Sequence, residues 1–437
     1  MDIAGKTVTI IGGQRSGMAL ARLVTDLKGA ARISERGGED GFSSDFKEWA
    51  AGHHVAIEYN GHTRDFIEHS DLVVLSPGVR IDAPPVQWAK AKGILVLGEI
   101  EFAAQFCARP IIAVTGSNGK TTVSTLITEI LRRAGYNPRL CGNVGLPFSE
   151  FVLRLKDVDY IVLEVSSFQL ESLLDPSSEF QRLAVSDPLH VDGFKPRIAV
   201  ILNLNDNHLD RHRDMEEYFN AKKRIFLNQD SADHIVLNGD QPQIRELSLQ
   251  ARSRAVYFNA RSTDPLVKNP NYAAALEVGK ILNIREQICR EAFIEFKGVE
   301  HRLEKVRRLR GVDYINDSKA TTAQAALWAL ENIEQPILMI CGGRDKNIDF
   351  SVLVEPVQQR VKKMYVIGEA RAKIRQAFDD LVNLEECEGL EEAVRKAARN
   401  ASEGDCVLLS PMCASFDMFR DFEERGRVFK DIVNKLR

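Results

Sequence analysis

The stretch AVTGSNGKTT has the residue types of a phosphate-binding loop. Gly116 and Gly119 bracket a tight turn between an expected strand and an expected helix, and such a turn directs backbone N–H groups and the positive helix end at an anion. Lys120 offers a point charge to the β- and γ-phosphates of a nucleotide, and Thr121 offers a hydroxyl to Mg²⁺. The usual P-loop has a further glycine where this chain has Val114, so the loop is a shortened version. An ordinary glycine-rich turn is the alternative interpretation.

Two residues at other strand ends could complete a metal site beside this loop. Glu164 ends the apolar run in DYIVLEVSSFQLE, where an unpaired buried carboxylate would be costly and where its oxygens would suit Mg²⁺. His208 follows the apolar run RIAVILN. Ligands gather outside the carboxyl ends of strands in open parallel sheets, and both residues follow strand ends. The alternatives are a glutamate that turns to solvent from an edge strand and a structural histidine.

Lys222 lies on the apolar stripe of an expected helix in MEEYFNAKKRIFLN, whereas Lys223 points elsewhere. The stripe also contains Met215, Tyr218, Phe219 and Phe226. A lysine on a buried stripe must find a partner, lose its proton or be modified. A lysine that extends from the edge of the stripe to solvent is the alternative.

The N-terminal stretch IIGGQRSGM partly matches a dinucleotide-binding loop. Gly12 and Gly17 fit the outer glycines of GxGxxG, and Glu35 follows about twenty residues later. The middle position is Gln14, whose side chain would crowd a pyrophosphate that approaches the backbone. This argues against a nicotinamide cofactor.

Alternating strands and helices in three successive sections must position these residues, which favours an α/β fold. The series restarts near residues 98 and 299, so we expect domains at 1–98, 99–298 and 299–437. In the central section, apolar residues at helical spacing predict a helix over Thr121–Ala134 that Gly135 terminates.

Composition excludes several classes of protein. The 437 residues have a net charge of −4, which leaves no basic surplus for nucleic acid. No run approaches the ~20 apolar residues of a membrane span, and no signal peptide is visible at the N-terminus. The seven cysteines are scattered without a CxxC pair, which indicates a reducing compartment. We expect a cytoplasmic protein and a monomer.

Together these motifs resemble the ATP-dependent Mur ligases of peptidoglycan synthesis. TGSNGKTT, EVSSFQLE, NHLDRH and YFNAKKRIF are similar to the central ATPase domain of that family. EHRLE, NDSKATT, GGRDKNIDF and LSPMCASFDMFRDFEERG are similar to its C-terminal domain. The resemblance covers nearly the whole chain in the same order. It implies a Rossmann-like N-terminal domain, a central P-loop ATPase domain and a Rossmann-like C-terminal domain.

The resemblance also implies roles for individual residues. ATP would contact Gly116, Ser117, Asn118, Gly119, Lys120, Thr121, Thr122, Asn271, Arg302 and Asp317. Catalysis would depend on Lys120, Glu164, His208 and Lys222, with two Mg²⁺ ions held by Thr121, Glu164, His208 and Lys222 as its carbamate. The UDP part of the substrate would contact Arg15, Ser16, Glu35, Arg36 and Gly78, and its muramoyl part Asn143 and Ser166. The amino acid would contact Lys319, Thr321, Lys346, Ser415 and Phe422.

The reaction that the resemblance implies is amide formation driven by ATP cleavage. LSPMCASFDMFRDFEERG is the stretch most similar to the family member that adds D-glutamate to UDP-N-acetylmuramoyl-L-alanine. The carboxylate would be activated as an acyl phosphate, and the amine of D-glutamate would displace phosphate. Cationic Lys319 and Lys346 suit a dicarboxylate amino acid.

Some positions depart from the family pattern, and alternatives stay open. Asn207 stands where the family has Asp, Thr322 where it has Asn, and Val267–Lys268 where a His-Asn pair precedes Asn271. The segment 238–267 is shorter than the family norm and the segment 175–197 is longer. One alternative is a regulatory protein that binds a nucleotide or a muropeptide and has weakened catalytic activity. A sister ligase for another amino acid, or for L-glutamate, is the other.

Overall fold

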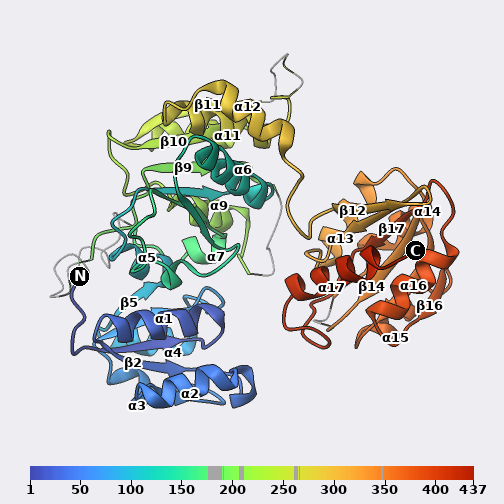
Figure 1. The fold of residues 1–437 in the computed structure, drawn as a ribbon. Coiled ribbons are helices and arrows are strands. Elements are labelled where there is room, and N and C mark those ends of the chain that lie inside the picture. Colours follow the sequence, from blue (N-terminus) through green and yellow to red (C-terminus); the bar gives the residue numbers. More distant parts are fainter. Residues whose placement is uncertain (176–188, 190, 206–210, 260–263, 265, 346–347) are drawn as a thin grey trace. The chain divides into compact units, whose positions relative to one another are not determined.

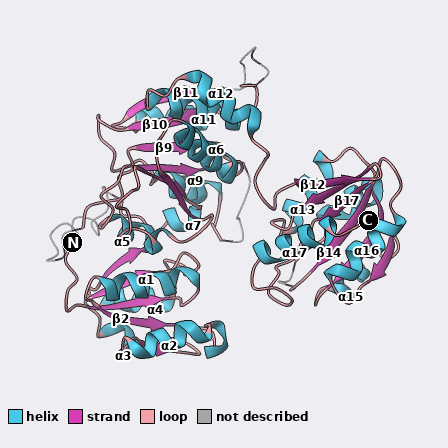
Figure 2. Ribbon diagram, viewed as in Figure 1, coloured by secondary structure: helices cyan, strands magenta, loops and turns pink. Residues whose placement is uncertain are grey.

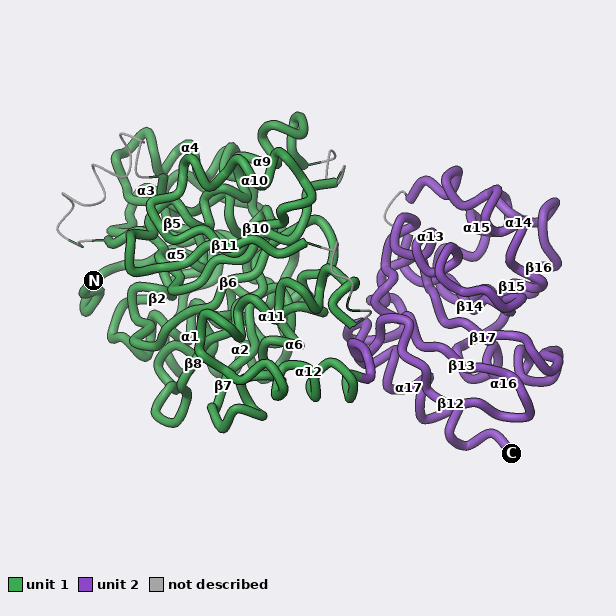
Figure 3. Tube along the Cα trace, turned by 90° about the horizontal axis from the view of Figure 1, so that it is seen from above, with its two compact units in different colours: residues 1–296 green, residues 297–437 purple. Residues whose placement is uncertain are grey.

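The structure, a computed structural model, describes residues 1–175, 189, 191–205, 211–259, 264, 266–345 and 348–437 (Figure 1). Three predominantly parallel β-sheets follow one another along the chain, and helices pack on both faces of each (Figure 2). The chain divides into two compact units, residues 1–296 and 297–437 (Figure 3). The predicted α/β fold is confirmed. The first two sheets share one unit, so a domain boundary near residue 98 stays a prediction.

The first sheet has the order β3-β2-β1-β4-β5, with all neighbours parallel. Its strands are β1 (Thr7–Ile11), β2 (Ala30–Ser34), β3 (Ala56–Glu58), β4 (Leu72–Leu75) and β5 (Leu95–Gly98). α1 (Arg15–Asp26) and α2 (Ser44–Gly52) pack on one face of this sheet, and α3 (Arg64–Glu68) and α4 (Pro84–Ala91) pack on the other. The short helix η1 (Glu39–Gly41) lies between β2 and α2 in the chain. The carboxyl end of β1 leads directly into the loop that precedes α1.

The central sheet has the order β11-β10-β9-β6-β8-β7, again parallel. Its strands are β6 (Ile111–Thr115), β7 (Pro138–Gly142), β8 (Tyr160–Glu164), β9 (Ile198–Ile201), β10 (His234–Asn238) and β11 (Arg254–Phe258). One face packs on α6 (Lys120–Arg133), α11 (Pro270–Ile281) and α12 (Glu286–Glu295). The remaining helices of this region are α5 (Glu99–Ala104), η2 (Phe148–Glu150), α7 (Ser167–Leu170), α9 (Met215–Lys223), α10 (Pro242–Arg245) and η3 (Glu246–Leu249).

The sheet of the second unit has the order β12-β13-β17-β14-β15-β16. Its strands are β12 (Glu304–Leu309), β13 (Val312–Asn316), β14 (Ile337–Gly342), β15 (Val361–Ile367), β16 (Asn383–Glu386) and β17 (Cys406–Leu409). Only the edge strand β12 runs antiparallel among the strands described. The helices are α13 (Ala323–Asn332), η4 (Ser351–Leu353), α14 (Val354–Arg360), α15 (Arg371–Phe378), α16 (Leu390–Asn400) and α17 (Phe422–Asn434).

Local sequence explains why α6 begins and ends where it does. Gly119 precedes the helix in a left-handed conformation (φ 82°), which a glycine adopts without steric cost. Gly135, at φ 88°, follows it and ends it as predicted. The helix starts at Lys120, one residue earlier than predicted, so the cationic side chain belongs to its first turn. Within the described residues, no helix has both the length and the apolar character needed to cross a membrane.

Candidate active site

The predicted phosphate loop joins β6 to α6 at the carboxyl edge of the central sheet. Its glycines are needed there, because a Cβ on Gly116 would lie 2.9 Å from Leu202 Cβ and a Cβ on Gly119 would lie 2.3 Å from Asn271 Oδ1. The first N–H groups of a helix have no partner within that helix, so the start of α6 offers donors to an anion. Asn271, predicted as a nucleotide contact, therefore packs directly on this loop.

Lys120 and Lys222 meet at one carbonyl group of the loop. Lys120 Nζ donates to Gly116 O at 2.9 Å and to Ser117 O at 3.0 Å, and Lys222 Nζ donates to the same Gly116 O at 3.0 Å. Lys222 is only 1% exposed, so the prediction that it is buried is confirmed. Burial, and then the charge of Lys120, hold the pKa of Lys222 well below its usual value. Lys222, which belongs to α9, thus brings to the loop a lysine amine whose burial favours the neutral form.

Glu164 ends β8 with its side chain 1% exposed. β8 lies between β6 and β7, so the alternative of an edge-strand glutamate that faces solvent is wrong. Asn143 Nδ2 donates to Glu164 Oε1 at 2.7 Å, whereas Glu164 Oε2 is buried with no hydrogen-bond partner among the described residues. Ser166 lies two residues beyond and caps α7 by accepting from Gln169 N. A buried carboxylate oxygen without a donor suits a cation.

Residues that sequence reasoning missed fix the shape of the loop. Ser117 N donates to Asn203 O at 2.9 Å, and Asn118 N donates to Asn203 Oδ1 at 2.8 Å. Ser117 Oγ lies 3.0 Å from the hydroxyl of Tyr218, one turn before Lys222. The stretch NLNDN after β9 carries the signal, because polar residues that follow a central strand must face this edge. Predicted contacts Thr121 and Thr122 lie in the first turn of α6.

Two predicted site residues, His208 and Lys346, lie outside the described residues, as does Asn207. His212, four residues beyond His208, is buried at 2% exposure. Its ring lies 5.9 Å from that of Phe168 and 5.3 Å from that of Tyr218. Burial lowers the pKa of His212, which favours the neutral imidazole.

The N-terminal loop is held by Glu35, which follows β2. Its carboxylate accepts from Gly13 N at 2.5 Å and from Gly37 N at 2.7 Å. A Cβ on Gly17 would lie 1.9 Å from Gly12 O, which explains the glycine. The remaining predicted contacts flank this loop, where Arg15 and Arg36 are exposed and Ser16 is half-buried. Arg15, Ser16, Glu35 and Arg36 therefore lie at the carboxyl ends of the neighbouring strands β1 and β2.

Arg211 links the turn Ser76-Pro77-Gly78 (the SPG turn), which follows β4 of the first sheet, to the central sheet. Its guanidinium donates to Gly78 O at 3.1 Å, to Val79 O at 3.0 Å and to the carboxylate of Glu171. Arg80 donates in return to Arg211 O at 3.3 Å. Sequence reasoning selected Gly78 but missed Arg211, although it belongs to the motif NHLDRH. The turn predicted to hold the UDP part is thus tied to the segment that follows His208.

In the second unit, Asp317 and Arg302 come together after β13. Asp317 is 3% exposed and accepts from Leu303 N at 3.2 Å and from Ser410 Oγ at 3.1 Å. Burial raises the pKa of Asp317 to about 7. The guanidinium carbon of Arg302 lies 5.5 Å from the centre of the Trp328 ring. Trp328, missed from the sequence, is 46% exposed.

Lys319, Thr321, Ser415 and Phe422, the predicted amino-acid contacts among the described residues, follow strands of the same sheet at its carboxyl edge. Lys319 Nζ lies 5.9 Å from the ring centre of Phe422, the first residue of α17. Thr321 N donates to Lys319 O at 2.9 Å, and Ser415, 2% exposed, follows β17. Thr322 caps α13 by accepting from Ala325 N at 3.2 Å. Asn and Thr are both good N-cap residues, so the departure at Thr322 keeps the local structure.

Arg425 is a further missed residue and holds this edge together. It is 1% exposed and donates to Ser318 Oγ at 3.0 Å, to Ser318 O at 2.9 Å and to Cys413 O at 3.2 Å. Burial lowers the pKa of Arg425 to about 10. The sequence does indicate that Arg425 is buried, because it lies three residues after Phe422 and four before Phe429, on the apolar face of α17.

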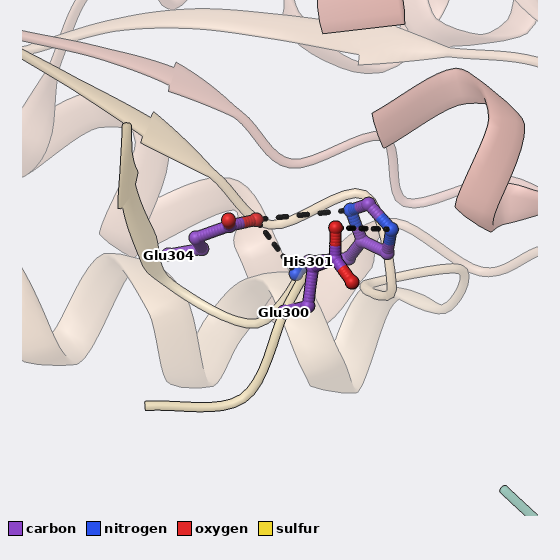
Figure 4. Close-up of side chains that lie close together, drawn as sticks. All are labelled: Glu300, His301 and Glu304. Atoms are coloured by element: carbon purple, nitrogen blue, oxygen red, sulfur yellow. Dashed lines mark hydrogen bonds and ion pairs between the residues drawn. The ribbon is translucent and has the colours of Figure 1, made fainter. Parts of the chain in front are cut away.

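His301 lies in a cluster with Glu300 and Glu304 (Figure 4). His301 Nδ1 is 3.8 Å from Glu304 Oε2, and Nε2 is 3.7 Å from Glu300 Oε1. Lys430 Nζ lies 2.6 Å from Glu300 Oε1 and 2.9 Å from Glu304 Oε1. Asn316 Nδ2 lies 2.9 Å from His301 Nδ1. Because an ammonium already bridges both carboxylates, the cluster is a hydrogen-bonded network that Lys430 neutralises rather than a metal site.

Comparisons with known proteins identify relatives of this chain. Residues 114–298 match the Mur ligase middle domain, and residues 301–413 match the Mur ligase, glutamate ligase domain. The UDP-N-acetylmuramoylalanine--D-glutamate ligase of Koribacter versatilis is 36% identical over 467 residues, which covers 100% of this chain and 99% of that protein. The same-named ligase of Pelotomaculum thermopropionicum is 38% identical over 469 residues, with 100% and 99% covered.

Solved structures agree in fold. UDP-N-acetylmuramate-alanine ligase from Thermotoga maritima superposes with a TM-score of 0.57 at 16% identity, over 98% of this chain and 99% of that one. A second Thermotoga maritima ligase, MurF in complex with ADP, superposes with a TM-score of 0.55 at 16% identity, over 93% and 95%. Two family models that together match more than half of the residues, and relatives that align from end to end, show that this chain belongs to the Mur ligase family.

Proposed function

We propose that this protein is an ATP-dependent ligase that joins D-glutamate to UDP-N-acetylmuramoyl-L-alanine in peptidoglycan precursor synthesis, with release of ADP and phosphate. The observation that carries the proposal is the convergence of Lys120, Lys222 and Glu164 at one sheet edge. It occurs in a chain that aligns over its full length with relatives named for that reaction. A binding protein without catalysis would have no need for a buried lysine and an unpartnered buried carboxylate beside a phosphate loop.

We further propose three domains with separate tasks. Residues 1–98 would hold the UDP part of the substrate, residues 99–298 ATP and the reacting carboxylate, and residues 299–437 the amino acid. The sites are those predicted from the sequence, with Arg211, Asn203, Tyr218 and Arg425 added as positioning residues on the contacts described above. We propose that the protein works in the cytoplasm, as a monomer.

A divalent cation fits the residues present at this edge. Glu164 Oε2 is a buried anionic atom with no donor among the described residues, and Thr121 would add its hydroxyl from the first turn of α6. Glu164, Thr121, His208 and Lys222 as its carbamate are the residues that would hold two Mg²⁺ ions. When bound, such ions neutralise phosphate charge and let two anions approach each other.

Carbamylation of Lys222 is part of the proposal. The uncharged amine adds to CO₂, a C–N bond forms, and one proton leaves to solvent, which converts the side chain from a base into an anion. Burial, and then the charge of Lys120, lower the pKa of Lys222, which favours the uncharged amine that reacts with CO₂. The product anion would lie beside the ammonium of Lys120, where an opposite charge is favourable.

In the proposed reaction, the substrate carboxylate attacks the γ-phosphorus of ATP, the bond to ADP breaks, and an acyl phosphate forms. The amine of D-glutamate then attacks the acyl carbon, phosphate leaves, and the amine proton is released. Lys120 would turn from the carbonyls of Gly116 and Ser117 toward the transferred phosphoryl group. Lys319 would pair with a carboxylate of the incoming amino acid.

One assay tests the proposal: phosphate release from ATP and Mg²⁺ with UDP-N-acetylmuramoyl-L-alanine and a panel of amino acids that includes both glutamate enantiomers. We expect turnover with D-glutamate and at least a hundredfold less with L-glutamate. Turnover with another amino acid only, or none with any, would overturn the proposal.

A further inference from the structure

A groove of about 650 Å³ crosses one end of the second unit. The β12–β13 hairpin, the C-terminal half of α16 and the residues after α17 form its walls, and Figure 3 shows β12, α16 and the chain end gathered at that end. Leu309, Val312, Tyr314, Ala398, Ala401 and Leu436 form an apolar floor that is half-buried or buried. Arg310, Arg395, Arg399, Lys435 and Arg437 surround it, and all five are exposed.

The groove carries uncompensated positive charge. Arg395 pairs with Glu391 at 2.8 Å, but the other four cations have no ion pair among the described residues. No acidic side chain lines the groove. Outside the lining, Glu391 pairs with Arg395, and the side-chain carbons of Glu403 lie close to Gly311. A cluster of four unpaired cations around an apolar floor attracts an anionic ligand with an apolar part.

The hairpin turn supports a binding role for Arg310. Leu309 pairs with Val312, so Arg310 and Gly311 form a two-residue turn, with φ angles of 51° and 77°. Such turns favour Asn, Asp or Gly at the first position, because other side chains meet steric resistance at positive φ. An arginine here works against the local preference and places a cation at the mouth of the groove.

The groove is separate from the candidate active site of the same unit. It lies at the amino ends of β13 and β17, where Val312 begins β13 and Ala401 precedes β17. Asp317, Lys319 and Ser415 follow the carboxyl ends of these strands. Occupation of the groove therefore does not block the predicted substrate contacts of this unit.

We propose that this groove docks a short acidic peptide segment of another protein, with one or two apolar side chains on the floor. A flat anionic membrane fits less well, because the first turns of α16 carry the acids Glu391 and Glu392 beside the cations. A narrow peptide avoids those acids. A small molecule would stay largely exposed in an open groove walled by exposed side chains, whereas small-molecule sites enclose most of their ligand.

The test uses the full-length protein and a fluorescein-labelled peptide of about twelve residues, with Leu at every third position and Glu elsewhere. Fluorescence anisotropy at low salt should give saturable binding that weakens as salt rises. The double variant Arg310→Asn/Arg399→Gln should bind at least fivefold more weakly, and Asn at position 310 also suits the turn. The matched control Lys156→Gln/Arg285→Gln removes two exposed cations of the first unit and should change binding less than twofold.

A peptide with Ser in place of Leu should bind at least threefold more weakly, because it leaves the floor uncovered. The proposal is overturned if the acidic peptide shows no saturable binding at millimolar concentration. It is also overturned if the groove and control variants weaken binding equally. Co-sedimentation with phosphatidylglycerol vesicles that depends on Arg310 and Arg399, without peptide binding, would assign the groove to a membrane instead.

Discussion

Removing dissolved CO₂ should lower the activity of the wild-type protein, and added bicarbonate should restore it. The reason is the short distance between the side-chain nitrogens of Lys120 and Lys222, which share one acceptor. Both side-chain nitrogens donate to Gly116 O, at 2.9 Å and 3.0 Å, so they lie at most about 6 Å apart. At that distance two like charges repel by roughly 3 kcal/mol with an effective dielectric constant of about 20.

Carbamylation reverses the sign of this interaction. An anion on Lys222 would attract Lys120 by a similar amount, so relative to the uncharged amine the modification favours their interaction by roughly 3 kcal/mol before desolvation. Desolvation is the larger cause of the low pKa of Lys222 and already favours the uncharged amine that reacts with CO₂. The modified side chain is therefore the form that suits both the buried position and the neighbouring lysine.

The assay compares phosphate release in CO₂-depleted buffer with release after bicarbonate is added. Lys222→Ala should lose at least a thousandfold in turnover, about 4 kcal/mol in activation free energy, and bicarbonate should not rescue it. Lys223→Ala is the matched control, since Lys223 is half-buried against Phe219 and away from the loop. With ¹³C-bicarbonate, a carbamate resonance should be present in wild type and Lys223→Ala and absent in Lys222→Ala. Near-normal turnover of Lys222→Ala, or wild-type activity indifferent to CO₂, would refute this reasoning.

Three further outcomes follow from buried groups. Glu164→Gln should lower turnover at least a hundredfold with an unchanged melting temperature, because the amide can still accept from Asn143 but carries no charge. A melting temperature that falls together with turnover would contradict a catalytic role. Burial raises the pKa of Glu101 to about 8 from 4.5, so wild type should lose up to roughly 5 kcal/mol of stability as pH rises between those values, at about 1.36 kcal/mol per unit. Urea unfolding at pH 5 and pH 8.5 measures this loss of stability. The loss should disappear in Glu101→Gln and persist in the exposed control Glu48→Gln. An equal loss in the two variants would contradict the assignment to Glu101. Arg425→Met should cost roughly 2 to 4 kcal/mol in unfolding free energy, because Ser318 O and Cys413 O lose a buried donor; a change below about 1 kcal/mol would show that those carbonyls find other donors.

Local patterns in the sequence were sufficient to predict some of these features. An apolar run that ends in Glu164 and a helical stripe that includes Lys222 each predict a buried charged group. Glu164 and Lys222 are both 1% exposed. The glycines of the loop could be predicted because a strand-to-helix turn needs positive φ, as Gly119 shows. These features depend on neighbours a few residues away, which is the range over which periodicity carries information.

Contacts between distant segments could not be predicted in the same way. Arg211 donates to Gly78 O across 133 residues, and Asn118 N finds Asn203 Oδ1 across 85. Each pairing depends on how the strands order themselves in the sheets, and a one-residue change of register would face a side chain to the opposite side. The motif containing Arg211 drew attention to its histidine, but only the fold shows that its arginine ties the SPG turn in place.

Lys222 and Arg425 show how one sequence signal leads to two different outcomes. Both are cations on the apolar face of a helix, and both are 1% exposed. A lysine can release its proton at moderate cost, so burial, and then the charge of Lys120, favour a neutral, reactive amine at Lys222. An arginine keeps its charge: burial lowers the pKa of Arg425 only to about 10, and carbonyl and hydroxyl oxygens of Ser318 and Cys413 accept its hydrogen bonds. A buried lysine beside a cation therefore indicates chemistry, whereas a buried arginine surrounded by carbonyls indicates a support for neighbouring loops.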